Sequence, residues 1–223
     1  METIYSQTVT LNDATVAGLC GVLQRAASAH QERLGTGQKE MRRRGVLWMI
    51  VRQKLVFDRQ PVCGESITVK TWLSEVRHGM LLRQYEVTGT DGAVICRAAA
   101  VWVLVDAEKR TMAQMALDAP LVQQEEQLPR FSLLRPMETE REYRFTVPRE
   151  YLDENGHMNN ARYFDAVAPI LPNGVLHAVQ ADYHAEAWEG EALDIGYALQ
   201  EKNLLIQAQG GRGLCFRMKW EYE

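Results

Sequence analysis

Alternating apolar and polar positions mark the clearest strand of this chain. Every second residue from 94 to 104 is apolar or small: Val94, Cys96, Ala98, Ala100, Trp102 and Leu104. A period of two is typical of a β-strand with one buried face. Just before this segment, Asp91-Gly92 is a dipeptide that favours the tight turn of a β-hairpin. The pattern therefore predicts two antiparallel strands that meet at this turn.

A helical period occurs once in each half of the chain. Apolar residues three and four positions apart run through residues 14–34 and again through residues 161–171. This spacing gives a helix one apolar side that can pack on a sheet. Gly35 and Pro172 follow the two segments and are typical of helix ends. Two amphipathic helices are therefore predicted, over 14–34 and 161–171.

The order of these elements is repeated along the chain. Tyr5-x-x-Thr-Val returns as Tyr143-x-x-Thr-Val, and Gly64-Glu65 returns as Gly190-Glu191. Cys96 and Trp102 are matched in the same order by Cys215 and Trp220. Several matches in one order indicate an internal duplication. A helix with several antiparallel strands in each copy predicts an α+β fold in which each sheet wraps its own helix.

The proline-rich stretch between the copies predicts the domain limits. Residues 119–140 contain Pro120, Pro129 and Pro136 together with a polar Gln-Gln-Glu-Glu run. Such composition is typical of a connecting segment. We expect an N-terminal domain at 1–118, a linker at 119–140 and a C-terminal domain at 141–223.

Composition narrows the classes of function. The 223 residues are 46% hydrophobic, enough for a sizeable core, and no apolar run approaches the roughly 20 residues of a membrane span. A formal net charge of -4 argues against nucleic-acid binding. The first residues resemble no secretory signal, so we expect a cytoplasmic protein. The four cysteines lie singly, which predicts reduced core thiols, no metal site and no cofactor.

One polar cluster distinguishes the second copy from the first. Asp153, Asn155 and His157 stand at alternate positions, which an extended segment would point to one side. The corresponding residues of the first copy are Thr15, Ala17 and Leu19. A purely structural need of the fold would be expected in both copies, so the difference favours a functional site. Asn159 and Asn160 follow, and turn or helix-cap roles explain these two equally well.

The pattern Asp-x-Asn-x-His-x-Asn-Asn-x-x-Tyr, from Asp153 to Tyr163, resembles the active-site motif of plant and bacterial acyl-ACP thioesterases. In the first half, Trp48, Arg59 with Pro61, Gly64-Glu65, Thr71-Trp72 and Trp102 are also similar to the family. The resemblance implies a tandem double hotdog, each half an antiparallel sheet wrapped around a central helix. It also implies hydrolysis of the thioester of fatty acyl-ACP, which releases free fatty acid and ends chain elongation.

The family also carries a glutamate on a strand of its second hotdog, in a Tyr-x-x-Glu-Cys context that Tyr183 to Ala187 resembles. The resemblance thus implies a catalytic set of Asp153, Asn155, His157 and Glu186. We expect Glu186 to be the base, Asn155 to polarise the thioester carbonyl, and His157 to orient the carbonyl or assist proton transfer. Asp153 would hold one of these groups in place. Because Ala187 replaces the cysteine of many plant members, the attacking group is water or a carboxylate.

The substrate and carrier are expected to contact other residues. The first copy is the predicted host of the acyl chain, near Trp48, Met49 and Ile50, with Asn159 and Asn160 as further substrate contacts. Acyl carrier protein is acidic, so a basic surface would attract it. The candidate docking residues are Lys39, Arg42, Arg43, Arg44, Arg149 and Arg162.

Two other functions fit the sequence. An acyl-CoA thioesterase of the same fold would differ only in the carrier. A non-catalytic acyl-binding protein is the second alternative, against which the complete catalytic set argues. A monomer and a homodimer are both compatible with a tandem pair.

Overall fold

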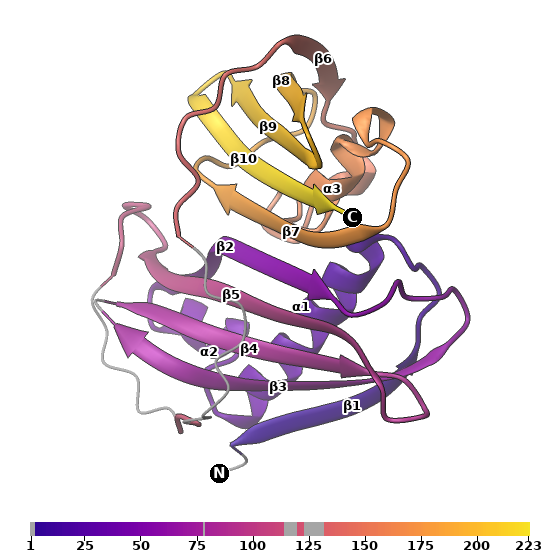
Figure 1. Ribbon diagram of the computed structural model, residues 1–223. Helices are drawn as coiled ribbons and strands as arrows, with labels where there is room; N and C mark the ends of the chain where they lie inside the picture. The colour runs from indigo at the N-terminus through magenta and orange to yellow at the C-terminus, as the bar shows by residue number, and fades with distance from the viewer. Residues whose placement is uncertain (1–2, 78, 114–119, 123–131) are drawn as a thin grey trace. The chain divides into compact units, whose positions relative to one another are not determined.

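The computed structural model of the chain describes residues 3–77, 79–113, 120–122 and 132–223 (Figure 1). The chain divides into two compact units, Met1–Arg130 and Phe131–Glu223. Part of the predicted linker, residues 119 and 123–131, lies outside the described residues. The domain limits 1–118, 119–140 and 141–223 therefore stay predictions.

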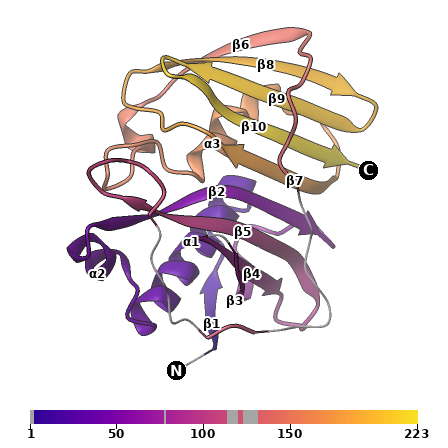
Figure 2. The ribbon, with the colours of Figure 1, turned by 90° about the vertical axis from the view of Figure 1, so that its left-hand side faces the viewer.

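The N-terminal unit is an antiparallel sheet with one long helix against it (Figures 1 and 2). Its strands lie in the order β1-β3-β4-β5-β2. The elements are β1 Ile4–Thr10, α1 Val16–Arg33, α2 Gln38–Arg43, β2 Val46–Phe57, β3 Ser66–Arg77, β4 Met80–Thr88 and β5 Val94–Asp106.

The helix α1 confirms the predicted helix of the first copy. The hydroxyl of Thr15 caps it by accepting a hydrogen bond from the Gly18 N–H at 3.1 Å. Its apolar side is buried, with Leu19, Ala26 and Ala27 at 0% exposure. The end at Arg33 is closed by the Leu34 N–H, which donates to the His30 carbonyl. Local capping and one apolar side thus define this helix from its own sequence.

The C-terminal unit repeats this layout in shortened form (Figure 2). Its sheet has the order β7-β10-β9-β8-β6, in which β6 pairs with β8 as β1 pairs with β3. The elements are β6 Arg141–Thr146, η1 Arg149–Tyr151, α3 Arg162–Ala166, η2 Ala168–Ile170, β7 Leu176–Tyr183, β8 Ala192–Gln200, β9 Asn203–Gly210 and β10 Gly213–Tyr222. The predicted α+β class and the internal duplication are confirmed.

The predicted helix at 161–171 is wrong in its length. The α-helix stops after five residues at Ala166, and a separate 3-10 turn contains Pro169. Proline has no N–H to donate and restricts the residue before it, so an α-helix does not continue through this point. The apolar side is nevertheless as predicted, because Tyr163 and Phe164 are buried and Phe164 packs edge-on to Trp220 at 5.9 Å.

The predicted hairpin turn between β4 and β5 is confirmed. The Ala93 N–H donates to the Asp91 side chain at 3.0 Å, and the Gly89 N–H donates to the Ala93 carbonyl at 2.9 Å. Gly92 has a φ of 78°, in the left-handed region that glycine adopts without a steric penalty. The Asp-Gly pair therefore closes the hairpin for the expected conformational reason.

Three of the cysteines lie in the core, as expected, but Cys63 is exposed. Its position in the connection between β2 and β3 explains this difference.

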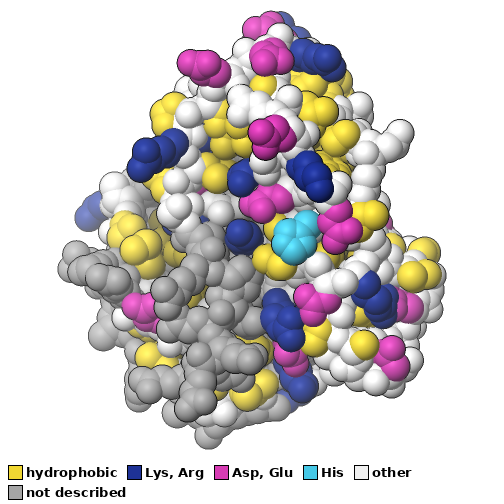
Figure 3. All heavy atoms as spheres, viewed as in Figure 1, with side chains coloured by type: hydrophobic (Ala, Val, Ile, Leu, Met, Phe, Trp, Pro, Cys, Tyr) yellow, Lys and Arg dark blue, Asp and Glu magenta, His cyan; other side chains and the backbone are white. Residues whose placement is uncertain are grey.

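Among the described residues there is no helix long and apolar enough to cross a membrane. No cluster of potential metal ligands occurs in that part of the chain either. Acidic and basic side chains are interspersed over the face in Figure 3.

Candidate active site

The polar motif of the second copy forms a turn closed by Asp153. The Asp153 N–H donates to the His157 carbonyl at 2.7 Å. The Asp153 carboxylate accepts from the backbone N–H groups of Asn155 at 2.8 Å and His157 at 3.3 Å. Gly156 has a φ of 80°, which this tight turn requires. The expectation of an extended segment is wrong, because the aspartate side chain satisfies the backbone locally and reverses the chain.

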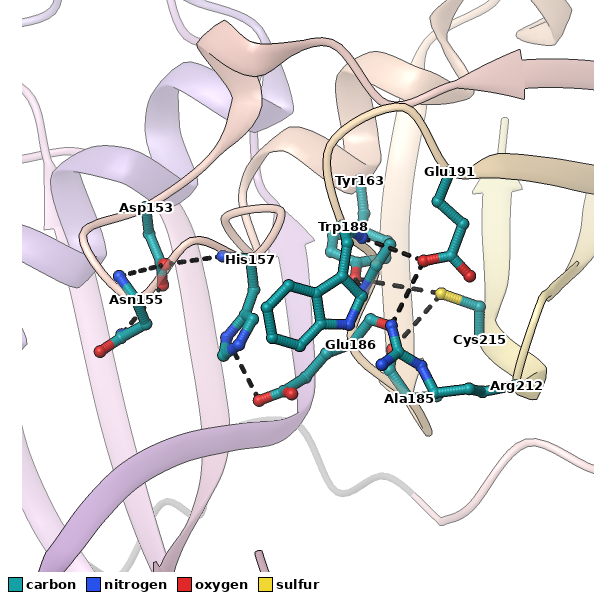
Figure 4. Close-up of polar contacts among 11 residues, drawn as sticks. Asp153, Asn155, His157, Tyr163, Ala185, Glu186, Trp188, Glu191, Arg212 and Cys215 are labelled. Atoms are coloured by element: carbon teal, nitrogen blue, oxygen red, sulfur yellow. Dashed lines mark hydrogen bonds and ion pairs between the residues drawn. The ribbon is translucent and has the colours of Figure 1, made fainter. Parts of the chain in front are cut away.

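The four predicted catalytic residues form two contacting pairs (Figure 4). The Asn155 side-chain amide donates to the Asp153 carboxylate at 3.2 Å. The imidazole of His157 lies 3.2 Å from the Glu186 carboxylate, measured from Nδ1 to Oε1. His157 and Glu186 keep only 9% and 24% of their side-chain surface exposed. A carboxylate that is partly removed from water in this way stabilises a positive charge on the imidazole more strongly than a carboxylate at an open surface does.

Glu186 lies in the segment between β7 and β8, so its expected place on a strand is wrong. The neighbouring N–H groups of His184 and Ala185 both donate to the Cys215 carbonyl, at 2.8 and 3.1 Å, which ends the regular ladder. The Ala187 carbonyl then accepts from the Met158 N–H at 2.8 Å. This last bond joins the glutamate segment to the motif turn and places Glu186 beside His157.

Trp188 and Arg212 belong to the same cluster, although the sequence did not identify them. The Trp188 ring meets the His157 ring edge-on, with centroids 4.3 Å apart. The Arg212 guanidinium lies 5.0 Å from the Trp188 ring centroid and donates to the Glu186 carbonyl at 3.3 Å. The signal available in the sequence was a tryptophan two residues beyond a candidate catalytic glutamate. In the structure Trp188 is 37% exposed.

Tyr163 was recognised in the motif but not as a site residue. Its hydroxyl accepts from the Ala187 N–H at 3.2 Å and lies 4.0 Å from the Cys215 thiol. Burial raises the pKa of Tyr163 far above its usual range, so the hydroxyl stays neutral. This contact fixes the backbone directly after Glu186.

We expect Tyr163→Phe to weaken the Glu186 segment. The buried Ala187 N–H would lose its acceptor, which typically costs about 1 to 3 kcal/mol in the free energy of unfolding. Thermal unfolding and hydrolysis should show a lower Tm together with a several-fold lower kcat. Tyr143→Phe on β6 is the matched control and should change neither value. Full activity in Tyr163→Phe would separate this hydroxyl from the site.

The predicted substrate contacts do not lie on one common surface. Met49 stands on the opposite face of β2 from Trp48 and Ile50, because successive strand residues alternate. The Trp48 indole donates to the Thr36 carbonyl at 2.8 Å. Asn159 uses its side chain to accept from the Ala161 N–H at 2.9 Å, as a turn residue does. Their roles in substrate binding stay predictions.

Comparison with known proteins places this arrangement in a family. The acyl-ACP thioesterase N-terminal domain model matches residues 2–120, and the C-terminal domain model of the same family matches residues 134–211. The chain belongs to the acyl-ACP thioesterase family. The motif turn and its histidine lie within the C-terminal match, as does Glu186.

Individual family members resemble the chain over most of its length. A chloroplastic acyl-(acyl-carrier-protein) hydrolase of Cuphea viscosissima is 22% identical over 93% of this chain and 58% of its own. A chloroplastic palmitoyl-acyl carrier protein thioesterase of Gossypium hirsutum is 26% identical, over 85% of this chain and 52% of its own. The chain thus spans about half the length of the curated relatives it matches.

A solved structure establishes the fold. The crystal structure of an acyl-ACP thioesterase from Bacteroides thetaiotaomicron VPI-5482 covers 99% of this chain and 98% of its own, with a TM-score of 0.85 at 20% identity. The fold is therefore the predicted tandem hotdog.

Proposed function

We propose that the chain hydrolyses the thioester of fatty acyl-ACP to free fatty acid and ACP, which ends fatty acid elongation. Water adds to the thioester carbonyl, the carbon–sulfur bond breaks, and the departing sulfur takes up a proton. The observation that carries the proposal is the contact between His157 and Glu186 in a chain of this family. An imidazole held by a partly buried carboxylate can move the proton that this reaction requires.

The His157–Glu186 pair is our candidate for the base. If Nδ1–H of His157 donates to Glu186, the basic lone pair of the imidazole lies on Nε2. Nε2 would then take the proton from water while the carboxylate stabilises the imidazolium. Direct proton transfer to Glu186 is the second assignment. Both assignments make the two residues act as one unit.

The Asp153–Asn155 pair supplies the electrostatic part of the proposal. An amide that donates to a carboxylate is held in one orientation before substrate arrives. Donors that are already oriented stabilise developing negative charge without the cost of reorganisation. We assign the Asn155 amide to the oxyanion and Asp153 to the placement of that amide and of the motif turn.

Cysteine chemistry is an unfavourable alternative at this site. Ala187 occupies the position after Glu186 and is fully buried. The nearby Cys215 thiol is also buried, which raises its pKa to about 11. Because only the thiolate is a strong nucleophile, Cys215 is mostly unreactive near neutral pH. These two observations support attack by water.

The carrier and the acyl chain are the finer parts of the proposal. We assign the acyl chain to the N-terminal unit and acyl carrier protein to the role of carrier. Release of free fatty acid should be measured from ACP and from coenzyme A bearing the same acyl groups. Preferential release from ACP supports the proposal, and preferential release from coenzyme A favours the acyl-CoA alternative. Acyl binding without release from either carrier would indicate a non-catalytic acyl-binding protein.

The predicted basic run lies mainly on the short helix α2, and Arg44 directly follows this helix. Within and directly after α2, Arg43 and Arg44 both pair with Glu40, at 2.9 and 2.7 Å. Hydrogen bonds from Arg43 and then Arg44 lower the pKa of Glu40 to about 2. The glutamate therefore stays charged and offsets part of the basic charge that would attract an acidic carrier.

Carrier docking can therefore be tested with two charge changes that should shift KM for acyl-ACP in opposite directions. Reversing Arg42, Arg43 and Arg44 to glutamate should raise KM for acyl-ACP by about tenfold and leave KM for a small thioester unchanged. Glu40→Gln should lower KM for acyl-ACP, because it removes the compensating charge. Both effects should shrink at high salt. Equal changes on both substrates would mean that the run is structural.

The two other docking candidates lie in the C-terminal unit. Arg162 pairs with Asp165 at 2.7 Å and lies 5.5 Å from the Tyr151 ring centroid. Arg149 is in the adjoining turn η1. Both stay proposals for contact with the carrier.

A further inference from the structure

A fully buried arginine on β4 is not accounted for by the proposed reaction. Arg83 is 0% exposed, and its side chain reaches from the sheet to α1, where it meets His30. Its neighbours across the sheet are Leu73 on β3 and Ala100 on β5, neither of which can neutralise a charge. A guanidinium in such surroundings carries a high desolvation cost unless an anion accompanies it.

Among the described residues, the partners of this cation are neutral. One nitrogen, Nη1, contacts His30 Nδ1 at 3.0 Å and donates to the Thr71 hydroxyl at 3.1 Å. A donor at Nη1 requires a lone pair on Nδ1, so we assign His30 as the neutral imidazole. Burial raises the pKa of the neighbouring Tyr85 to about 12, so this phenol is not a counter-charge. No ion pair joins Arg83 to a carboxylate among the described residues.

The remaining nitrogens of Arg83 have a specific geometry. Both Nε and Nη2 are buried without a hydrogen-bond partner in the described part of the chain. These two nitrogens share one edge of the planar guanidinium. Their parallel N–H groups match the two oxygens of a carboxylate, the bidentate arrangement that arginine forms most readily. The edge with no partner is therefore one that would suit a carboxylate.

We propose that the N-terminal hotdog binds an aliphatic carboxylate through the Nε and Nη2 edge of Arg83. The charge, the planar fork and the aliphatic neighbours together select a carboxylate attached to an alkyl chain. Two sources share this chemistry: the far end of an acyl group with a second carboxyl, or a free fatty acid. The inference rests on the proposed function only in assigning acyl chains to this unit.

Direct binding tests the carboxylate without requiring turnover. Calorimetry should compare decanoate with decan-1-ol on the wild type, Arg83→Met and Arg97→Met. Arg97 is the matched control, since it lies on β5 of the same unit and pairs with Asp58 at 2.9 Å. We expect Kd for decanoate to rise by about 10- to 100-fold in Arg83→Met alone, the usual weight of charge-assisted hydrogen bonds. Decan-1-ol should bind all three proteins equally.

Stability provides a second measurement on the same variants. Replacing a buried charge that lacks a counter-ion by an apolar side chain of similar length removes the desolvation cost of that charge, which offsets the hydrogen bonds lost to His30 and Thr71. The Tm of ligand-free Arg83→Met should therefore not fall, and decanoate should raise the Tm of the wild type more than that of the variant. If Arg83→Met does not fold, Arg83→Lys keeps the charge and removes the fork, and it should bind decanoate more weakly.

Hydrolysis distinguishes the two sources of the carboxylate. ACP carrying decanoyl or 9-carboxynonanoyl groups should be compared in wild type and Arg83→Met. A preference for the carboxylated chain that is lost in the variant assigns Arg83 to the substrate. Weaker inhibition of decanoyl-ACP hydrolysis by decanoate in the variant assigns it to a free acid. The inference is overturned if Arg83→Met binds decanoate as tightly as the wild type does. If Arg83→Met does not fold, the same result for Arg83→Lys overturns it. If the wild type binds decanoate through Arg83 but hydrolyses no acyl-ACP, only the proposed function is overturned.

Discussion

Replacing Glu186 by glutamine should lower kcat by roughly 10² to 10⁴ while the protein stays folded. Glutamine keeps the size of the side chain and a carbonyl that can accept from His157 Nδ1, which lies 3.2 Å away in the wild type. It removes the negative charge that takes the proton or stabilises the imidazolium. Steady-state hydrolysis of acyl-ACP and thermal unfolding on the same preparation measure both quantities.

The residue next to Glu186 supplies a control for this experiment. Ala187→Cys should alter kcat far less, because the Ala187 side chain is buried while Glu186 is partly exposed. A thiol placed there cannot replace the lost carboxylate. Near-normal hydrolysis by Glu186→Gln would remove this glutamate from the mechanism and leave Asp153 with His157 as the plausible catalytic pair.

Replacing His157 by glutamine should lower kcat by a similar factor, roughly 10² to 10⁴. The amide can still donate to Glu186, but it cannot accept and release a proton near neutral pH. The turn itself should survive, because Asp153 binds the backbone N–H of residue 157 and not its side chain. KM should change little, since the proposed role of the imidazole is in the chemical step.

A second histidine in the same unit gives the comparison for His157. His184 is exposed and lies two residues before Glu186, so His184→Gln makes the same chemical change outside the contact. It should retain nearly full activity. The double variant Glu186→Gln with His157→Gln should be about as slow as the slower single variant, because the two residues act as a unit. Losses that multiply would instead mean that they act independently.

The sequence predicted the elements whose causes are local. Alternation from Val94 to Leu104 identified β5, and the Asp91-Gly92 turn identified the hairpin before it. The apolar side and the end signals of α1 gave a helix within two residues of its observed bounds. Each of these features depends on neighbours a few positions away, so the order of residues is sufficient to predict it. The duplication and the family motif extended this reading to the whole chain.

Where local rules competed, the sequence alone was misleading. The apolar period of 161–171 suggested one helix, but Pro169 interrupts the hydrogen bonding after α3. Alternate polar positions suggested an extended segment, but the Asp153 carboxylate binds two backbone N–H groups and turns the chain. In both cases the backbone conformation differs from the predicted one.

Tertiary structure alone decided which side chains meet. The sequence by itself determined that Asp153, Asn155, His157 and Glu186 were the residues to examine. It could not show that they divide into two pairs, or that Trp188 and Arg212 join one of them. Nor could it show that Arg83 is buried without a counter-ion in the described part of the chain, since β4 reads as an ordinary strand. Such contacts depend on how distant strands and turns pack, because packing sets both the distance between charges and their exposure to water.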